Sequence, residues 1–93
     1  MPAHVKMYTR RWCGYCSAAQ NLLDEKGIDY ELVDCTGDEP TRKWLRDVTG
    51  RSTVPQIFID GKPIGGFDDL SRLDRKGELD ALIWRDAQHA PQQ

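Results

Sequence analysis

The chain has 93 residues, of which 39% are hydrophobic and 30% are charged, ordinary values for one soluble folded domain. Thirteen basic residues against 15 acidic ones give a net charge of −2, so we expect neither nucleic acid nor a membrane as a partner. The longest nearly apolar stretch, residues 54–59, is too short to span a bilayer, and the N-terminus has no continuous apolar run for a secretory signal. We therefore expect an intracellular, cytoplasmic protein.

The first third of the chain predicts a strand, a helix and a second strand. Residues 4–8 alternate as in a short strand, a helical pattern runs from Cys13 to Gly27, and residues 28–33 alternate again. The side chains expected inside the fold are those that keep the alternation or the helical period: Val5, Met7, Cys16, Ala19 and Leu23. Such a unit implies two parallel strands joined by a right-handed crossover.

The middle of the chain predicts a second helix and a hairpin. Asp38-Glu39-Pro40 has the features of a helix start, and Gly50 ends that helix. Its expected apolar stripe consists of Trp44, Leu45 and Val48. Residues 56–59 predict a third strand, which Asp60-Gly61 joins to residues 62–64 in a tight antiparallel turn.

The last third predicts two short helical segments and a polar end. The first begins at residues 67–69 and carries Leu70 and Leu73. The second is marked by apolar residues at helical spacing: Leu79, Leu82 and Ile83. We expect one domain over residues 1–87 and a frayed tail over residues 88–93.

The predicted order is β-α-β-α-β-β-α. It corresponds to a four-stranded mixed sheet with helices on both faces, an α/β architecture of thioredoxin type.

A pair of cysteines three residues apart is the main chemical signal. Cys13 and Cys16 fit a redox dithiol, half of a zinc site, or two inert buried cysteines. A structural zinc site needs four ligands, and the other candidates form no second pair: Cys35, His4 and His89. A helix N-terminus at Cys13 and the positive charge of Arg10 and Arg11 favour a thiolate, so we interpret the pair as a redox site.

Two further segments indicate a ligand. In Thr53-Val54-Pro55 the bond before proline can be cis, and the free polar backbone groups of Val54 can pair with an extended peptide. The alternative is a proline that only starts a strand. In residues 65–69 two glycines let a ligand approach, the helix N-terminus favours a carboxylate, and an aspartate can bind an amine. The alternative there is a turn with an ordinary helix cap.

Three segments together resemble a glutaredoxin, specifically a small bacterial dithiol glutaredoxin, over residues 4–84. They are 8–10 with Cys13-Gly14-Tyr15-Cys16, then 53–59, then 65–70. The resemblance implies a thioredoxin fold, a cis Val54–Pro55 bond, and a glutathione-dependent enzyme with glutathione as co-substrate. It implies that a monomer reduces protein disulfides and protein–glutathione mixed disulfides, with Cys13 as the nucleophile and Cys16 as the resolving thiol.

The same resemblance implies a groove for glutathione. Its expected residues are Arg10, Tyr15, Arg42, Thr53, Val54, Pro55, Gly66, Phe67, Asp68 and Asp69. Arg10 stands beside the glutathione sulfur and carboxylate, and Arg42 holds the glycine carboxylate. Residues 53–54 pair with the glutathione backbone, and residues 66–69 receive the γ-glutamyl end. Because glutathione carries two carboxylates and one amine, arginines and acids are chemically suited to it.

The chain departs from the usual glutaredoxin pattern at several positions. Gly14 replaces a proline, Trp12 is more typical of a thioredoxin, and Phe67 replaces a cysteine. Some glutaredoxins with glycine at this place resemble iron–sulfur carriers, so a 2Fe–2S cluster held by Cys13 and glutathione in a homodimer is the alternative function. Cys35 ends the second strand at the same sheet edge as Cys13, and we expect a plain strand-end residue rather than a regulatory thiol.

Overall fold

The computed structural model describes residues 3–84. The expected tail at residues 88–93, the end of the expected domain at residue 87, and His89 lie outside the described residues. The elements in chain order are β1 (Val5–Thr9), α1 (Gly14–Glu25), β2 (Glu31–Asp34), α2 (Glu39–Thr49), β3 (Gln56–Ile59), β4 (Lys62–Gly65), α3 (Phe67–Arg75) and α4 (Glu78–Ile83). The predicted alternation of strands and helices is confirmed, with two helices at the end where Gly77 adopts a left-handed φ of 76° between them.

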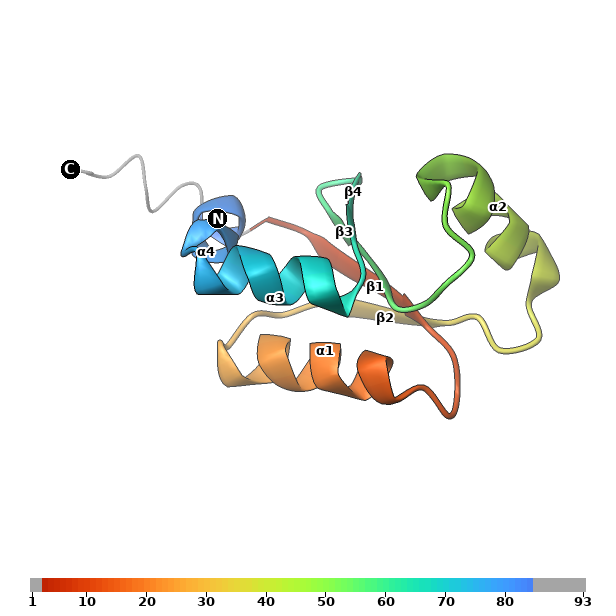
Figure 1. The fold of residues 1–93 in the computed structure, drawn as a ribbon, viewed down its shortest axis with the longest axis horizontal. Coiled ribbons are helices and arrows are strands. Elements are labelled where there is room, and N and C mark those ends of the chain that lie inside the picture. Colours follow the sequence, from red (N-terminus) through yellow and green to blue (C-terminus); the bar gives the residue numbers. More distant parts are fainter. Residues whose placement is uncertain (1–2, 85–93) are drawn as a thin grey trace.

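The four strands form one mixed sheet in the order β2-β1-β3-β4. β1 and β2 are parallel, as the crossover through α1 predicts, and β1–β3 and β3–β4 are antiparallel. The sheet thus matches the predicted architecture, and a loop leads from β1 to the start of α1 (Figure 1), where Cys13 is the N-cap.

The second strand begins later than the alternation predicts, at Glu31 instead of residue 28. The reason lies in the end of α1. Gly27 has a φ of 70° and donates to Asp24, while the Ile28 N–H donates to the Leu23 carbonyl at 2.9 Å. This Schellman-type ending occupies the backbone of Ile28 and buries its side chain, so strand pairing starts only after it.

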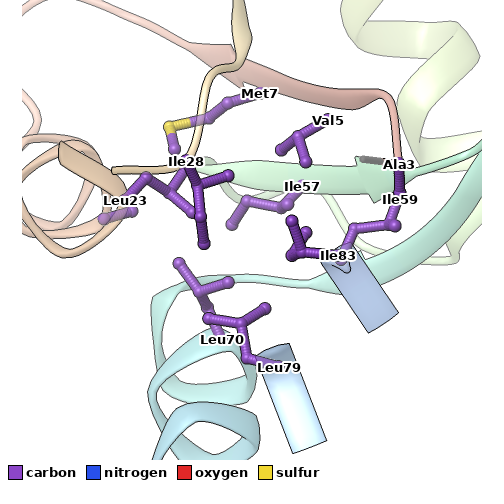
Figure 2. Packing of buried hydrophobic residues seen from close by; sticks show 11 residues of the cluster. Ala3, Val5, Met7, Leu23, Ile28, Ile57, Ile59, Leu70, Leu79 and Ile83 are labelled. Atoms are coloured by element: carbon purple, nitrogen blue, oxygen red, sulfur yellow. The ribbon is translucent and has the colours of Figure 1, made fainter. Parts of the chain in front are cut away.

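Helices cover both faces of the sheet (Figure 1). α1, α3 and α4 share one face, and their apolar side chains meet those of β1 and β3 in the main core (Figure 2). Its buried residues are Ala3, Val5, Met7, Ala19, Leu23, Ile28, Ile57, Ile59, Leu70, Leu79 and Ile83. The inward orientation predicted for Val5 and Met7 is confirmed, and the core fixes α1 and α3 side by side.

On the opposite face α2 packs over a smaller cluster: Tyr8, Cys35, Leu45 and Phe58. Asp38 caps this helix by accepting from the Thr41 N–H at 3.2 Å, and Gly50 ends it, as predicted. The predicted apolar stripe faces this cluster: Leu45 is buried and Trp44 packs on the rings of Tyr8 and Phe58, although Trp44 and Val48 remain nearly half exposed. Among the described helices α2 alone covers this face, so nothing encloses its outer side chains.

None of the helices within residues 3–84 combines the length and apolar character needed to cross a membrane.

Candidate active site

The cysteine pair lies at the junction between the β1–α1 loop and α1. Cys13 is the N-cap of α1, and Cys16 follows one turn later in the helix with only 2% of its surface exposed. The two residues form a disulfide, with their Cα atoms 5.2 Å apart. The less buried Cys13 is therefore the sulfur that an external partner can reach.

A backbone N–H of the helix bonds to the Cys13 sulfur. The Cys16 N–H donates to Cys13 Sγ at 3.2 Å, so the sulfur takes the place that a capping oxygen usually occupies. Because an N–H bond and the helix dipole both favour negative charge, this geometry stabilises the thiolate of the reduced protein. The predicted position of Cys13 at the N-terminus of a helix, with Cys16 one turn later, is thus confirmed.

The segment before β3 lies against the same sulfur. The carbonyl oxygen of Val54 is 3.7 Å from Cys13 Sγ, and the Val54–Pro55 bond is cis, as the sequence resemblance implies. The Val54 N–H donates to no acceptor within residues 3–84. A polar backbone group is thus available to pair with an extended ligand beside the sulfur.

A groove of about 490 Å³ opens next to the disulfide. It is lined by Arg10, Tyr15, Arg42, Arg51, Ser52, Thr53, Val54, Pro55, Gly66, Phe67, Asp68 and Asp69. All the positions that the resemblance implies for glutathione are therefore brought together around one cavity, although they come from five separate parts of the chain. The roles that the resemblance gives them stay predictions.

Two lining residues, Arg51 and Ser52, were missed by the sequence reasoning. Arg51 Nη1 lies 2.8 Å from Asp69 Oδ2, so the loop after α2 is tied to the start of α3. Ser52 presents its carbonyl to Arg42, whose Nη2 donates to it at 3.2 Å. Both residues directly precede the Thr53-Val54-Pro55 segment in the sequence. This position could have indicated them, because an arginine there adds positive charge to the same loop.

Asp69 is the most fully paired charge in the groove. Burial raises the pKa of this carboxyl, but hydrogen bonds from Arg51, the Gly66 N–H and Arg72 outweigh burial and leave the pKa below its ordinary value. Asp69 therefore stays ionised at neutral pH. Asp68 beside it is exposed and is also in the first turn of α3, where a helix N-terminus favours negative charge.

Close packing requires glycine at position 65 and leaves little space for a side chain at Gly66. Gly65 has a φ of 123°, and a Cβ there would overlap the Asp69 carboxylate. A Cβ on Gly66 would lie 3.3 Å from the Pro55 carbonyl oxygen. The glycines thus let the N-terminus of α3 approach the segment before β3, which closes that side of the groove.

An aromatic pair from α1 and α3 also lines the groove. The rings of Tyr15 and Phe67 are stacked, with centroids 6.2 Å apart, and Tyr15 is 66% exposed. Arg10 completes this end of the groove, and its Nη1 donates to the Arg11 carbonyl at 3.2 Å. The groove therefore combines an apolar wall with arginines and aspartates at its rim.

The third cysteine is separate from this chemistry. Cys35 follows β2, its N–H donates to Thr9 at 2.7 Å, and its thiol is fully buried in the cluster beneath α2. Burial raises the pKa of this thiol. Its position at the sheet edge near Cys13 is as predicted. Within residues 3–84, no three His, Cys, Asp or Glu side chains are grouped to hold a metal ion.

Known proteins share this chain's sequence and fold. The glutaredoxin family model matches residues 5–64. A glutaredoxin of Pseudomonas aeruginosa is 46% identical over 79 residues, which cover 85% of this chain and 94% of that protein. Glutaredoxin 3 of Escherichia coli K12 is 44% identical over 81 residues, covering 87% and 98%.

A solved structure supports the same relation. The crystal structure of a buckwheat glutaredoxin–glutathione complex superposes with a TM-score of 0.83 at 31% identity, covering 87% of this chain and 76% of that one. The fold, the cysteine pair and these relatives agree, and the chain belongs to the glutaredoxin family.

Proposed function

We propose that the groove beside the cysteine pair binds glutathione and that Cys13 is the nucleophile of this dithiol glutaredoxin. The chain is a glutathione-dependent disulfide oxidoreductase, as its family is. The observation that carries the proposal is the position of Cys13 Sγ. It accepts the Cys16 N–H at a helix N-terminus and lies 3.7 Å from the carbonyl oxygen of Val54, which lines a groove with arginines and aspartates. A thiolate held there is both a better nucleophile and a better leaving group.

The first reaction removes glutathione from a protein. The Cys13 thiolate attacks the glutathione sulfur of a protein–glutathione disulfide, the old S–S bond breaks, and the protein leaves as a thiolate that takes up a proton. A second glutathione thiolate then attacks the sulfur of the bound glutathione. Glutathione disulfide leaves, and the Cys13 thiolate is restored. One free glutathione is oxidised for each protein thiol released, because the glutathione taken from the protein was already part of a disulfide, so the electrons balance.

The second reaction reduces a protein disulfide. Cys13 attacks one sulfur of that disulfide, and Cys16, one helical turn away, attacks Cys13 and releases the client as a dithiol. The internal disulfide seen between Cys13 and Cys16 is the product of this route. Glutathione then reduces it in two steps.

Charge and backbone pairing support the orientation of glutathione in the groove. Arg10 and Arg42 suit its carboxylates, and the free Val54 N–H suits its peptide backbone. The first turn of α3, with Asp68 and Asp69, suits the γ-glutamyl end, since the helix N-terminus attracts its carboxylate and an aspartate its ammonium group. The buckwheat relative was crystallised with glutathione, which supports the same ligand here.

A coupled assay tests the function. With a glutathione mixed disulfide, glutathione and glutathione reductase, we expect turnover that Cys13→Ser abolishes. Cys16→Ser keeps this turnover, because removal of glutathione needs one thiolate, but loses dithiol reduction of protein disulfides. Turnover with thioredoxin reductase in place of glutathione, or equal loss in both variants on the mixed disulfide, would contradict the proposal.

We further propose a cytoplasmic monomer that serves disulfide-bonded and glutathionylated client proteins. The glutathione pool of that compartment supplies the reductant. The iron–sulfur alternative requires a free Cys13 sulfur, whereas Cys13 is joined to Cys16 in this structure.

A further inference from the structure

One large apolar side chain beside the nucleophile remains in water. Trp12 is 94% exposed, the highest value among the large hydrophobic residues of the described chain. Its side chain makes no hydrogen bond and no ring contact with other residues in 3–84. A tryptophan stabilises a fold mainly by burying its large apolar surface. Because this side chain stays in water, it contributes little to the stability of the fold.

The backbone holds Trp12 in an unfavourable conformation. Its φ is 60°, in the left-handed region, which glycine adopts without steric cost and which is unfavourable for a residue with a Cβ. The loop is anchored on both sides of Trp12: before it, the Arg11 N–H donates to Thr36 Oγ1 at 2.8 Å, and after it, Cys13 Sγ accepts the Cys16 N–H at 3.2 Å. A tryptophan fixed in this way, without a packing partner, points to a role outside the fold.

Trp12 lies outside the groove. Arg10 and Tyr15, two residues before it and three after it, both line the groove, whereas Trp12 does not. The inference rests on the proposed function, in which glutathione fills the groove. The protein half of a mixed disulfide is bonded to the glutathione sulfur that Cys13 attacks, so this half has to lie outside the groove. Trp12 directly precedes Cys13 in the chain and also lies outside the groove.

We propose that Trp12 is a docking residue for the protein half of the substrate, and that it packs on apolar side chains flanking the client's reacting cysteine. Exposed tryptophans that become buried in an interface contribute more to binding than most residues do. Trp12 then determines specificity: it favours glutathionylated proteins over small glutathione mixed disulfides, which have nothing to place against the indole.

The test compares two substrates that share one chemistry. Trp12→Ala and the native protein are assayed with glutathione and glutathione reductase on the cysteine–glutathione mixed disulfide and on serum albumin glutathionylated at its free cysteine. We expect kcat/KM for albumin to fall about ten-fold, the effect of losing one interface anchor. For the small substrate it stays within about two-fold, and Trp12→Phe keeps most of the albumin rate.

Two controls keep the outcome decisive. Leu32→Ala removes another exposed hydrophobic side chain, 48% exposed on β2, and leaves both rates unchanged. Trp12→Gly suits the left-handed backbone, so it reproduces the loss on albumin in a protein at least as stable. Equal loss on both substrates, or loss on neither, overturns the docking role. Failure of the native protein on the small substrate would instead contradict the proposed function.

Discussion

Arg42 and Asp69 show how single side chains define the groove. Arg42 comes from α2 and lines the groove, and its guanidinium donates to the Ser52 carbonyl. Asp69 comes from α3 and holds Arg51, Arg72 and the Gly66 N–H at once. The first is free to bind a carboxylate, whereas the second already organises its surroundings, so the two residues predict different effects of mutation.

We expect Arg42→Ala to raise the KM for glutathionylated substrates about ten-fold with little change in kcat. A hydrogen bond to a charged group contributes about 1.5–3 kcal/mol, and exposure at the rim favours the lower value. Steady-state kinetics in the glutathione reductase assay measure it. Lys43→Ala is the matched control, because this neighbour on α2 pairs with Asp47 and does not line the groove. An unchanged KM would remove Arg42 from the glutathione site.

Asp69→Asn should destabilise the fold in a pH-dependent way. The folded-state pKa of Asp69 lies below its ordinary value of 3.8, so its ionised form adds stability that is present at neutral pH and is lost as pH falls through the folded pKa. We expect the variant to lose about 1 kcal/mol at pH 7, since the arginine partners are exposed. Urea unfolding of the reduced proteins at pH 7 and pH 3 measures this. A deficit of the same size at both values would show that the charge of Asp69 is not the cause.

At the scale of elements, α1 and the turn before it set up the chemistry. The helix starts at Gly14, directly after the cysteine that caps it, and Cys13 has extended backbone angles of −120° and 105°. That backbone is the conformation which a following proline favours. A Cβ on Gly14 would meet no atom within 4 Å, so the position has space for a side chain.

Gly14→Pro should therefore stabilise the protein. Proline suits the first position of a helix, where the N–H has no partner within the helix, and it restricts the unfolded chain. We expect the free energy of unfolding of the reduced form to rise by about 0.4–1 kcal/mol, measured by urea titration. Gly14→Ala serves as the comparison for the loss of glycine alone. A less stable proline variant would mean that the N-terminus of α1 is not formed as described.

Much of this element-level arrangement could be predicted from the sequence, and the misses have physical causes. The cysteine pair, the cap at Asp38 and the Asp60-Gly61 turn depend on neighbouring residues, so local patterns were sufficient. The later start of β2 depends on how α1 ends, and the exposure of Trp44 depends on what covers one sheet face. The spacing of apolar residues along the sequence indicates neither of these features.

The candidate site was predictable for a different reason. Its lining positions followed from three motifs of a familiar family, not from periodicity. Arg51 was not predicted as a lining residue, because its partner Asp69 is 18 residues away in the sequence and the two meet only after folding.

At the scale of the whole molecule, the fold assembles the groove from both faces of the sheet and keeps Cys35 apart from the reactive pair. The core between the sheet and α1, α3 and α4 fixes the helix N-termini that face the groove, while α2 brings Arg42 from the other face (Figures 1 and 2). The buried Cys35 stays on the α2 side, apart from the reactive pair. One chain thus carries the proposed nucleophile, the proposed resolving thiol and every proposed glutathione contact.

Because one chain is sufficient, we expect the protein to remain a colourless monomer. After anaerobic reconstitution with iron, sulfide and glutathione, light scattering and visible absorbance report mass and colour. Cys16 competes for Cys13 by forming the internal disulfide, which disfavours sharing that sulfur with a cluster. A brown dimer whose absorbance requires both Cys13 and glutathione would support the iron–sulfur alternative instead.

The central claim is that Cys13 takes glutathione from the substrate while Cys16 only resolves. Intact-mass spectrometry of reduced Cys16→Ser, mixed with one equivalent of a peptide–glutathione disulfide and then mapped by peptide digestion, tests it most directly. We predict a gain of one glutathione on Cys13 and none on the buried Cys35, with release of the peptide thiol. Glutathione found on Cys35, the peptide bound to Cys13 in its place, or no adduct at all would contradict the account.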